Sequence, residues 1–249
     1  MRIKTAFLSS SFILHPSSLN LLKANKSPWF ETLFAVYNRN LFGRRFGALR
    51  VEGIENLRNR KTDLPLVLYA NHSSWWDGLV AFEIGRVAGL DQFLMMEEKQ
   101  LKQLFLFRRL GAFSVVRENP RMALLSINYA VDVLKEKPNR GVWIFPQGEI
   151  LPNDARPLRF YQGLARIIEK TGRCTAAAVA MRYEFLGEFK PTAFAKISNV
   201  EILANVEEPK QLTEQLSLRL TALLDELKAD IAAEKTSEYV DLLKKNAAN

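Results

Sequence analysis

The chain has 249 residues, of which 48% are hydrophobic, and a formal net charge of +8. This length is enough for one sizeable hydrophobic core and short for two. The single cysteine, Cys174, excludes an internal disulfide framework, and its apolar neighbours indicate a packing role. No apolar run approaches the roughly 20 residues of a membrane-spanning helix, so we expect no such helix.

The positive charge is concentrated in the N-terminal quarter. Up to Thr62 there are eleven lysines and arginines against three glutamates, so the remaining residues are balanced. Such an excess indicates an anionic partner near this part of the chain. Residues 1–14 combine two cations with an apolar patch that serines interrupt, which favours a segment lying on a surface over a signal peptide.

An amphipathic helix is predicted over residues 28–46, with Ser27 as N-cap and Pro28 as its first residue. Four apolar residues recur at helical spacing: Trp29, Leu33, Val36 and Tyr37. Aromatics mixed with arginines are typical of helices in the membrane interface, whereas an ordinary helix would cover the core. We predict that residues 1–50 form a membrane-associating segment and that residues 51–249 form an α/β domain.

The stretch 64–77, LPLVLYANHSSWWD, predicts a buried strand followed by a turn and a helix. His72 and Asp77 are five positions apart, so on one continuous helix they would point about 140° apart. A loop at His72, with Ser73 or Ser74 capping a helix that starts near Trp75, bends the chain and lets the carboxylate reach the imidazole. This arrangement predicts a catalytic pair.

Strands and helices alternate along the rest of the chain. Further strands are predicted at 92–96, 112–116, 141–145, 175–183 and 193–203. Helices are predicted at 77–87, 97–108, 120–136, 157–170 and 210–231. The alternation predicts an α/β fold with a largely parallel central sheet flanked by helices.

Polar residues follow three of the predicted strands, where ligands bind in open α/β sheets. They are the Asn71, His72 and Asp77 group, Arg117 at the end of GAFSVVR, and the turn FPQGE at 145–149. Each alone has an ordinary explanation, as a satisfied histidine, a solvated arginine or a simple turn. Together they provide a base, an orienting carboxylate, a cation for a phosphate and backbone N–H groups for an anion.

NHSSWWD, GAFSVVR and FPQGE, in this order, resemble the motifs of the glycerolipid acyltransferase family, which includes the 1-acylglycerol-3-phosphate acyltransferases. The family pattern is Asn-His-x-x-x-x-Asp, then Gly-x-x-x-x-x-Arg, then Phe-Pro-Glu-Gly-Thr. The resemblance implies transfer of a fatty acyl group from acyl-CoA or acyl carrier protein to a hydroxyl of a lysophospholipid such as 1-acylglycerol-3-phosphate. It implies no metal or other cofactor and no nucleic acid partner. The protein would act at the cytoplasmic face of a membrane with anionic lipids, as a peripheral or monotopic protein.

The resemblance also implies residue roles. His72 would be the general base and Asp77 would orient it. Asn71, Gly148 or neighbouring backbone N–H groups would stabilise the oxyanion. The predicted substrate-binding residues are Asn71, Arg117, Phe145, Pro146, Gln147, Gly148 and Glu149.

The third motif departs from the family pattern, which puts the acceptor in doubt. Gln147 replaces a glutamate, Glu149 replaces a threonine, and Ile150 stands where the family usually has arginine or serine. A carboxylate at position 149 disfavours a neighbouring phosphate. An uncharged or glycosylated lipid is therefore an alternative acceptor, and a catalytically silent lipid-binding protein is a further alternative. A serine hydrolase is disfavoured because the chain has no Gly-x-Ser-x-Gly motif.

Overall fold

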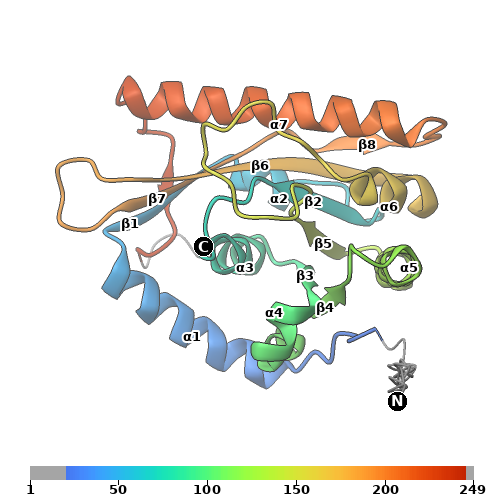
Figure 1. The fold of residues 1–249 in the computed structure, drawn as a ribbon. Helices are drawn as coiled ribbons and strands as arrows, with labels where there is room; N and C mark the ends of the chain where they lie inside the picture. Colours follow the sequence, from blue (N-terminus) through green and yellow to red (C-terminus); the bar gives the residue numbers. More distant parts are fainter. Residues whose placement is uncertain (1–20, 245–249) are drawn as a thin grey trace, which may run out of the picture.

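The computed structural model describes residues 21–244 as a central sheet between two layers of helices (Figure 1). The surface segment predicted over residues 1–14 lies outside the described residues. No helix in the described part is long and apolar enough to cross a membrane.

Nine strands within residues 21–244 form one sheet, in the order β4-β3-β5-β2-β6-β7-β1-β9, with β8 also paired to β6. The five strands from β4 to β6 are mutually parallel, and β7 is antiparallel to β6. The largely parallel sheet predicted from the alternation is therefore confirmed. The strands are β1 Ala48–Glu52, β2 Leu66–Ala70, β3 Asp91–Glu97, β4 Ala112–Val115, β5 Arg140–Ile144, β6 Cys174–Glu184, β7 Thr192–Ile197, β8 Glu201–Leu203 and β9 Val240–Asp241.

Strand β2 lies at the centre, between β5 and β6. Both faces of β2 are buried, because its side chains alternate between two hydrophobic clusters. Val67 and Tyr69 pack in the cluster beneath α5, α6 and α7, whereas Leu66 and Leu68 pack with α1, α2 and α3. A continuous apolar run is what a strand buried on both faces requires.

Helices cover both faces of the sheet, with α7 on one side and α1 and α3 on the other (Figure 1). The helices are α1 Pro28–Arg45, α2 Ile54–Arg58, α3 Asp77–Val87, α4 Glu98–Gln103, the 3₁₀ helix η1 Phe105–Leu110, α5 Pro120–Glu136, α6 Gly163–Thr171 and α7 Pro209–Ala232. Helix α1 begins at Pro28 as predicted, although the Ser27 side chain makes no capping hydrogen bond.

Three predicted elements differ from the structure. The helix predicted over 97–108 is broken at Leu104, and this turn lets Phe107 of η1 pack against Phe34 of α1 at 5.7 Å between ring centroids. The strand predicted over 193–203 is divided into β7 and β8, whose pairings with β6 differ by one residue in register. Such a shift is typical of a β-bulge.

The third difference lies just before α6. The helix predicted from residue 157 begins only at Gly163, because Tyr161 N–H donates to the carbonyl of Pro146 and Leu158 is buried in the core. Strands β1 and β9 and helix α2 were not predicted at all. These short elements carry too few residues for a periodic pattern.

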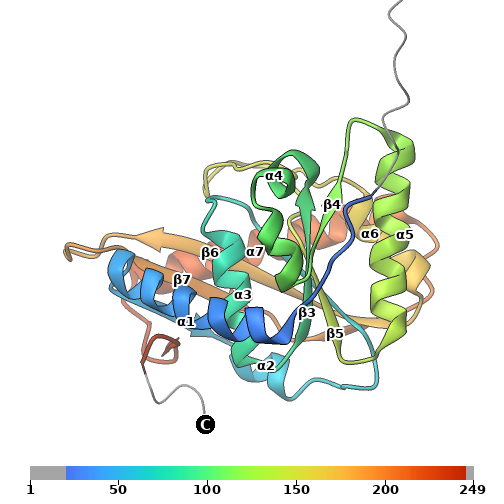
Figure 2. The same ribbon diagram turned by 90° about the horizontal axis from the view of Figure 1, so that it is seen from below.

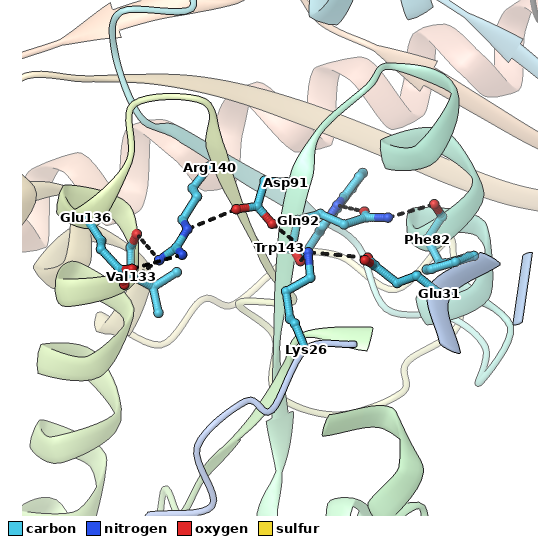
Figure 3. A network of polar contacts seen from close by, with 9 residues as sticks. All are labelled: Lys26, Glu31, Phe82, Asp91, Gln92, Val133, Glu136, Arg140 and Trp143. Atoms are coloured by element: carbon cyan, nitrogen blue, oxygen red, sulfur yellow. Dashed lines mark hydrogen bonds and ion pairs between the residues drawn. The ribbon is translucent and has the colours of Figure 1, made fainter. Parts of the chain in front are cut away.

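Residues 21–27, here called the strap, run beside β4 and lead into α1. Lys26 of the strap forms ion pairs with Asp91 at 2.6 Å and with Glu31 at 3.3 Å. Asp91 also accepts from Arg140 at 3.0 Å, so this network links the strap, β3 and β5 (Figure 3). Burial acts to raise the pKa of Asp91, but the hydrogen bonds and charges of Lys26 and Arg140 outweigh it and lower that pKa.

Residues 240–243, near the C-terminus, bind to β1 and α1. Strand β9 pairs antiparallel with β1, and Leu242 N–H donates to Leu49 O at 2.8 Å. The guanidinium of Arg39 in α1 donates to Leu243 O at 2.7 Å. Strand β1 extends across position 50, the boundary predicted between the N-terminal segment and the α/β domain.

Cys174, at the start of β6, is fully buried. Burial raises the pKa of its thiol to about 12, so the thiol stays protonated at neutral pH. The packing role predicted for this residue is confirmed.

Candidate active site

His72 and Asp77 meet where β2 ends and α3 begins. The imidazole Nδ1 lies 2.8 Å from Asp77 Oδ2; the Asp77 side chain is fully buried, and the His72 side chain is 18% exposed. The contact predicted from the bend in the chain is therefore present. Because an ionised carboxylate only accepts hydrogen bonds, Nδ1 carries the proton and Nε2 keeps its lone pair.

The loop after β2 wraps around the Asp77 carboxylate. Oδ2 accepts the backbone N–H groups of Ser73 at 2.7 Å and Ser74 at 2.8 Å, in addition to the imidazole. We expected the side chain of Ser73 or Ser74 to cap a helix that starts near Trp75. Helix α3 instead begins at Asp77, and the side chain of Asp77 accepts hydrogen bonds from the backbone of both serines. These donors hold the carboxylate in place.

The FPQGE turn after β5 holds the other side of the His72 loop. Gln147 Oε1 accepts His72 N–H at 2.8 Å, and Leu151 N–H donates to His72 O at 2.8 Å. The Phe145 ring stacks on the imidazole, with ring centroids 4.7 Å apart. The histidine is thus fixed by backbone contacts as well as by Asp77.

Gly148 brings Arg117 into the same site. Its φ of +72° is a left-handed conformation, and a Cβ there would collide with the Arg117 guanidinium and lie 2.9 Å from Tyr161 Cε2. The Arg117 guanidinium lies over the Tyr161 ring, 5.2 Å from its centroid. The missing side chain at 148 therefore makes room for the cation.

These groups open into a pocket of about 610 Å³. Its polar lining includes His72, Arg117, Glu97 and Glu149, and its apolar lining comes from several elements. The apolar residues are Leu94, Met95, Met96, Leu104, Phe107, Ile127, Ile144, Phe145, Ile150 and Leu164. A base at the edge of an apolar pocket suits chemistry on a molecule with a long hydrocarbon part.

The family model described as Acyltransferase matches residues 48–182, which is more than half of the chain. The chain belongs to the acyltransferase family. Among solved structures, it is similar to the 1-acyl-sn-glycerophosphate (LPA) acyltransferase PlsC from Thermotoga maritima, with a TM-score of 0.61 and 22% sequence identity. That likeness covers 81% of this chain and 80% of the other, and it supports the fold. Comparison with curated protein sequences gives no match.

Two of the predicted substrate-binding residues of this acyltransferase face the protein instead of the pocket. Asn71 is 2% exposed; its Nδ2 donates to Met181 O and Asn153 Oδ1, each at 3.0 Å, and its Oδ1 accepts Met181 N–H at 2.7 Å. Gln147 is also 2% exposed and binds the His72 backbone. Both side chains therefore support the loop that carries His72.

The expected oxyanion donors are engaged in the same way. The Asn71 amide binds β6, and Gly148 N–H donates to Phe145 O at 3.0 Å. The other predicted substrate-binding residues, Arg117, Phe145, Pro146, Gly148 and Glu149, line the pocket.

Tyr183 was not predicted as part of the site. Its hydroxyl donates to Asp77 Oδ1 at 2.5 Å from the end of β6. Burial raises the pKa of Tyr183 well above 10, and the adjacent Asp77 carboxylate raises it further, so the phenol remains a donor. The available signal was its position at the end of a strand, but 106 residues separate the two partners.

The serines beside His72 do not form a hydrolase triad. Ser73 Oγ has no hydrogen-bond partner, and Ser74 Oγ accepts Trp76 N–H at 3.3 Å. Neither hydroxyl is activated by the imidazole. Among residues 21–244, no group of three or more His, Cys, Asp or Glu side chains is arranged to hold a metal ion.

Proposed function

We propose that this acyltransferase moves a fatty acyl group from acyl-CoA or acyl carrier protein to a hydroxyl of a lysophospholipid. The observation that carries the proposal is the His72–Asp77 pair, 2.8 Å apart, at the edge of the apolar pocket. The family establishes acyl transfer in general terms, and the site suggests which residues perform it.

In the proposed reaction, His72 Nε2 takes the proton of the acceptor hydroxyl as its oxygen attacks the thioester carbonyl carbon. Asp77 holds the imidazole and stabilises the imidazolium. The tetrahedral intermediate collapses when the carbon–sulfur bond breaks, and the imidazolium returns the proton to the leaving thiolate. The products are an ester and a free thiol, without an acyl-enzyme intermediate.

Arg117 supports an acceptor that carries a phosphate. Its guanidinium is held by the Tyr161 ring and lines the pocket that His72 enters. A guanidinium at this place neutralises a phosphate group through charge-assisted hydrogen bonds.

A phosphate-free lipid or glycolipid is the second candidate acceptor. It is favoured by the carboxylates of Glu97 and Glu149, which line the same pocket as Arg117. Two carboxylates in a pocket that holds one arginine disfavour a phosphate dianion.

The test incubates purified protein with a labelled long-chain acyl thioester, carried by CoA or by acyl carrier protein. The acceptors are lysophosphatidate, other lysophospholipids, glycerol phosphate and glycolipids. His72→Ala and Asp77→Asn are expected to abolish transfer while the far-ultraviolet circular dichroism is unchanged. Asp63→Asn, at an exposed carboxylate before β2, is the matched control.

Each outcome distinguishes the candidates. Undiminished transfer by His72→Ala would contradict the mechanism. Turnover of lysophosphatidate alone would exclude the phosphate-free acceptor, and turnover of glycolipids alone would exclude the phosphate-bearing one. Lipid binding without turnover of any acceptor would support the catalytically silent alternative.

We further propose that the protein works at the cytoplasmic surface of a membrane, with α1 in the interface. Helix α1 buries Phe34 and Phe42, whereas the stripe predicted from the sequence faces outward. Its members are Trp29 at 62%, Leu33 at 58%, Val36 at 59% and Tyr37 at 57% exposure. Exposed aromatics on a helix with several arginines favour an anionic lipid interface.

The pocket lies beside this helix, since Phe107 both lines the pocket and packs against Phe34. Lipid substrates could thus pass from the bilayer into the pocket. Salt-sensitive binding to anionic vesicles is expected, and Leu33→Glu should weaken it. Leu218→Glu, on the exposed surface of α7, is the matched control, and equal binding by both variants would refute the role of α1.

A further inference from the structure

The turn between β6 and β7 carries large apolar side chains that are exposed and do not belong to the hydrophobic core. Within residues 185–190, here called the hairpin tip, Phe185 is 69% exposed, Leu186 is 52% exposed and Phe189 is fully exposed. Turns usually carry glycine, proline, asparagine, aspartate or serine. Single exposed apolar residues are ordinary, but three large ones in one short turn form a patch that indicates an interaction site.

The hairpin tip lies directly beyond the C-terminal end of α1, as Figures 1 and 2 both show. One hydrogen bond joins the two elements, since Lys190 Nζ donates to Gly43 O at 2.7 Å. A second joins the residues that follow them, since Gly47 N–H donates to Pro191 O at 3.0 Å. The exposed apolar residues of the hairpin tip therefore lie at the end of the same helix that carries the outward-facing stripe.

Cations surround this end of the molecule. Arg44 and Arg45 occupy the last turn of α1 and are exposed, and Lys190 lies on the hairpin tip itself. The exposed carboxylate in the hairpin tip is that of Glu188. Apolar side chains flanked by an excess of cations match a bilayer, in which anionic headgroups surround a hydrocarbon interior.

We propose that the hairpin tip is a second membrane-inserting element, which enters the same anionic bilayer as α1. The contact then extends from Phe105 of η1, 64% exposed near the start of α1, to Phe189 beyond its end. Contacts at both ends hold α1 parallel to the membrane surface. The inference rests on the membrane association proposed for α1 and adds a site that α1 does not provide.

The buried thiol makes a site-specific test possible. Cys174 is 0% exposed, so a cysteine introduced at the surface can be labelled selectively with an environment-sensitive fluorophore. Three variants are labelled separately: Phe189→Cys on the hairpin tip, Leu33→Cys on α1, and Leu218→Cys on α7, which lies across the sheet from α1 (Figure 1). Leu218 is 70% exposed and is the matched control.

The labelled proteins are mixed with vesicles of phosphatidylcholine and phosphatidylglycerol, some of which carry quenchers on their acyl chains. We expect blue-shifted emission and quenching at positions 189 and 33, and neither change at position 218. A probe at 189 that behaves like the one at 218, while the probe at 33 enters the bilayer, overturns this inference and leaves the role of α1 intact. If neither 189 nor 33 responds, the membrane proposal and this inference both fail.

A second measurement keeps the test independent of the labels. Phe189→Ser removes one fully exposed aromatic and is expected to lower the vesicle partition coefficient roughly tenfold, without changing the thermal unfolding midpoint. Lys210→Ser, on an exposed residue of α7, serves as the comparison. Equal partition coefficients for Phe189→Ser and the unmodified protein would overturn the proposal.

Discussion

Removing the hydroxyl of Tyr183 tests whether this residue of β6 positions the Asp77 carboxylate. Tyr183→Phe keeps the ring, which packs 5.7 Å from the Phe46 ring, and deletes only the 2.5 Å hydrogen bond to Asp77 Oδ1. Hydrogen bonds to charged groups contribute about 1.5–3 kcal/mol. Because Asp77 keeps its bonds to the imidazole and to two backbone N–H groups, we expect the lower value, which is roughly a tenfold loss in kcat.

Without the phenol, the Asp77 carboxylate loses the donor that holds Oδ1, and the imidazole bound to Oδ2 is less firmly oriented. The effect should therefore fall on kcat. The KM should be unchanged, because Tyr183 is not among the residues that line the pocket.

The assay is steady-state transfer from a labelled acyl thioester, with kcat and KM determined separately. Tyr239→Phe is the matched control, because Tyr239 donates to Asp230 at 3.0 Å outside the site. A Tyr183→Phe enzyme with unchanged kcat would refute the positioning role. A rise in KM alone would refute it as well, since that result would place the residue against the substrate.

Three further changes test other parts of the structure. Gly148→Ala forces a side chain into a left-handed conformation at a cost of about 1–2 kcal/mol and displaces Arg117, so the acceptor KM should rise more than the donor KM; equal changes would contradict this geometry. Asp91→Asn should lower the free energy of unfolding by about 1–3 kcal/mol at neutral pH. Because the pKa of Asp91 is lowered by folding, urea titrations should show this difference above about pH 4 and its loss as the pH falls through the lowered pKa; a constant difference would contradict it. Ala123→Leu narrows the pocket and should shift the kcat/KM preference towards shorter acyl chains, whereas Leu124→Ala, at an exposed neighbour, should not.

Much of the fold could be predicted from local patterns in the sequence. The apolar run of β2, the bend after it and the alternation of strands and helices predicted the parallel sheet. The same bend predicted the His72–Asp77 contact, because both partners lie within one loop and one helix start. The predicted start of α6 was wrong by six residues, over 157–162. In this segment Tyr161 N–H bonds to the Pro146 carbonyl, far away in the sequence, instead of to a carbonyl in a helix.

Long-range partners could not be predicted in this way. Tyr183 reaches Asp77 only because β6 pairs with β2, and strand order is not encoded in any local pattern. Asn71 and Gln147 were expected in the pocket because they belong to the motifs. A motif position does not reveal which way its side chain points. The hydrogen bonds to Met181 and to the His72 backbone decide those directions.

The fastening of α1 by the C-terminal residues has a consequence for biosynthesis. Arg39 and its acceptor Leu243 are 204 residues apart, so at 5–20 residues per second the ribosome needs roughly 10–40 s to deliver the second after the first. Until then α1 lacks this hydrogen bond, whereas Phe34 can already pack against Phe82 and Phe107. The attachment of α1 to the C-terminal residues is therefore a late step for a chain that folds during its synthesis, and it comes after the helix has packed on its aromatic partners.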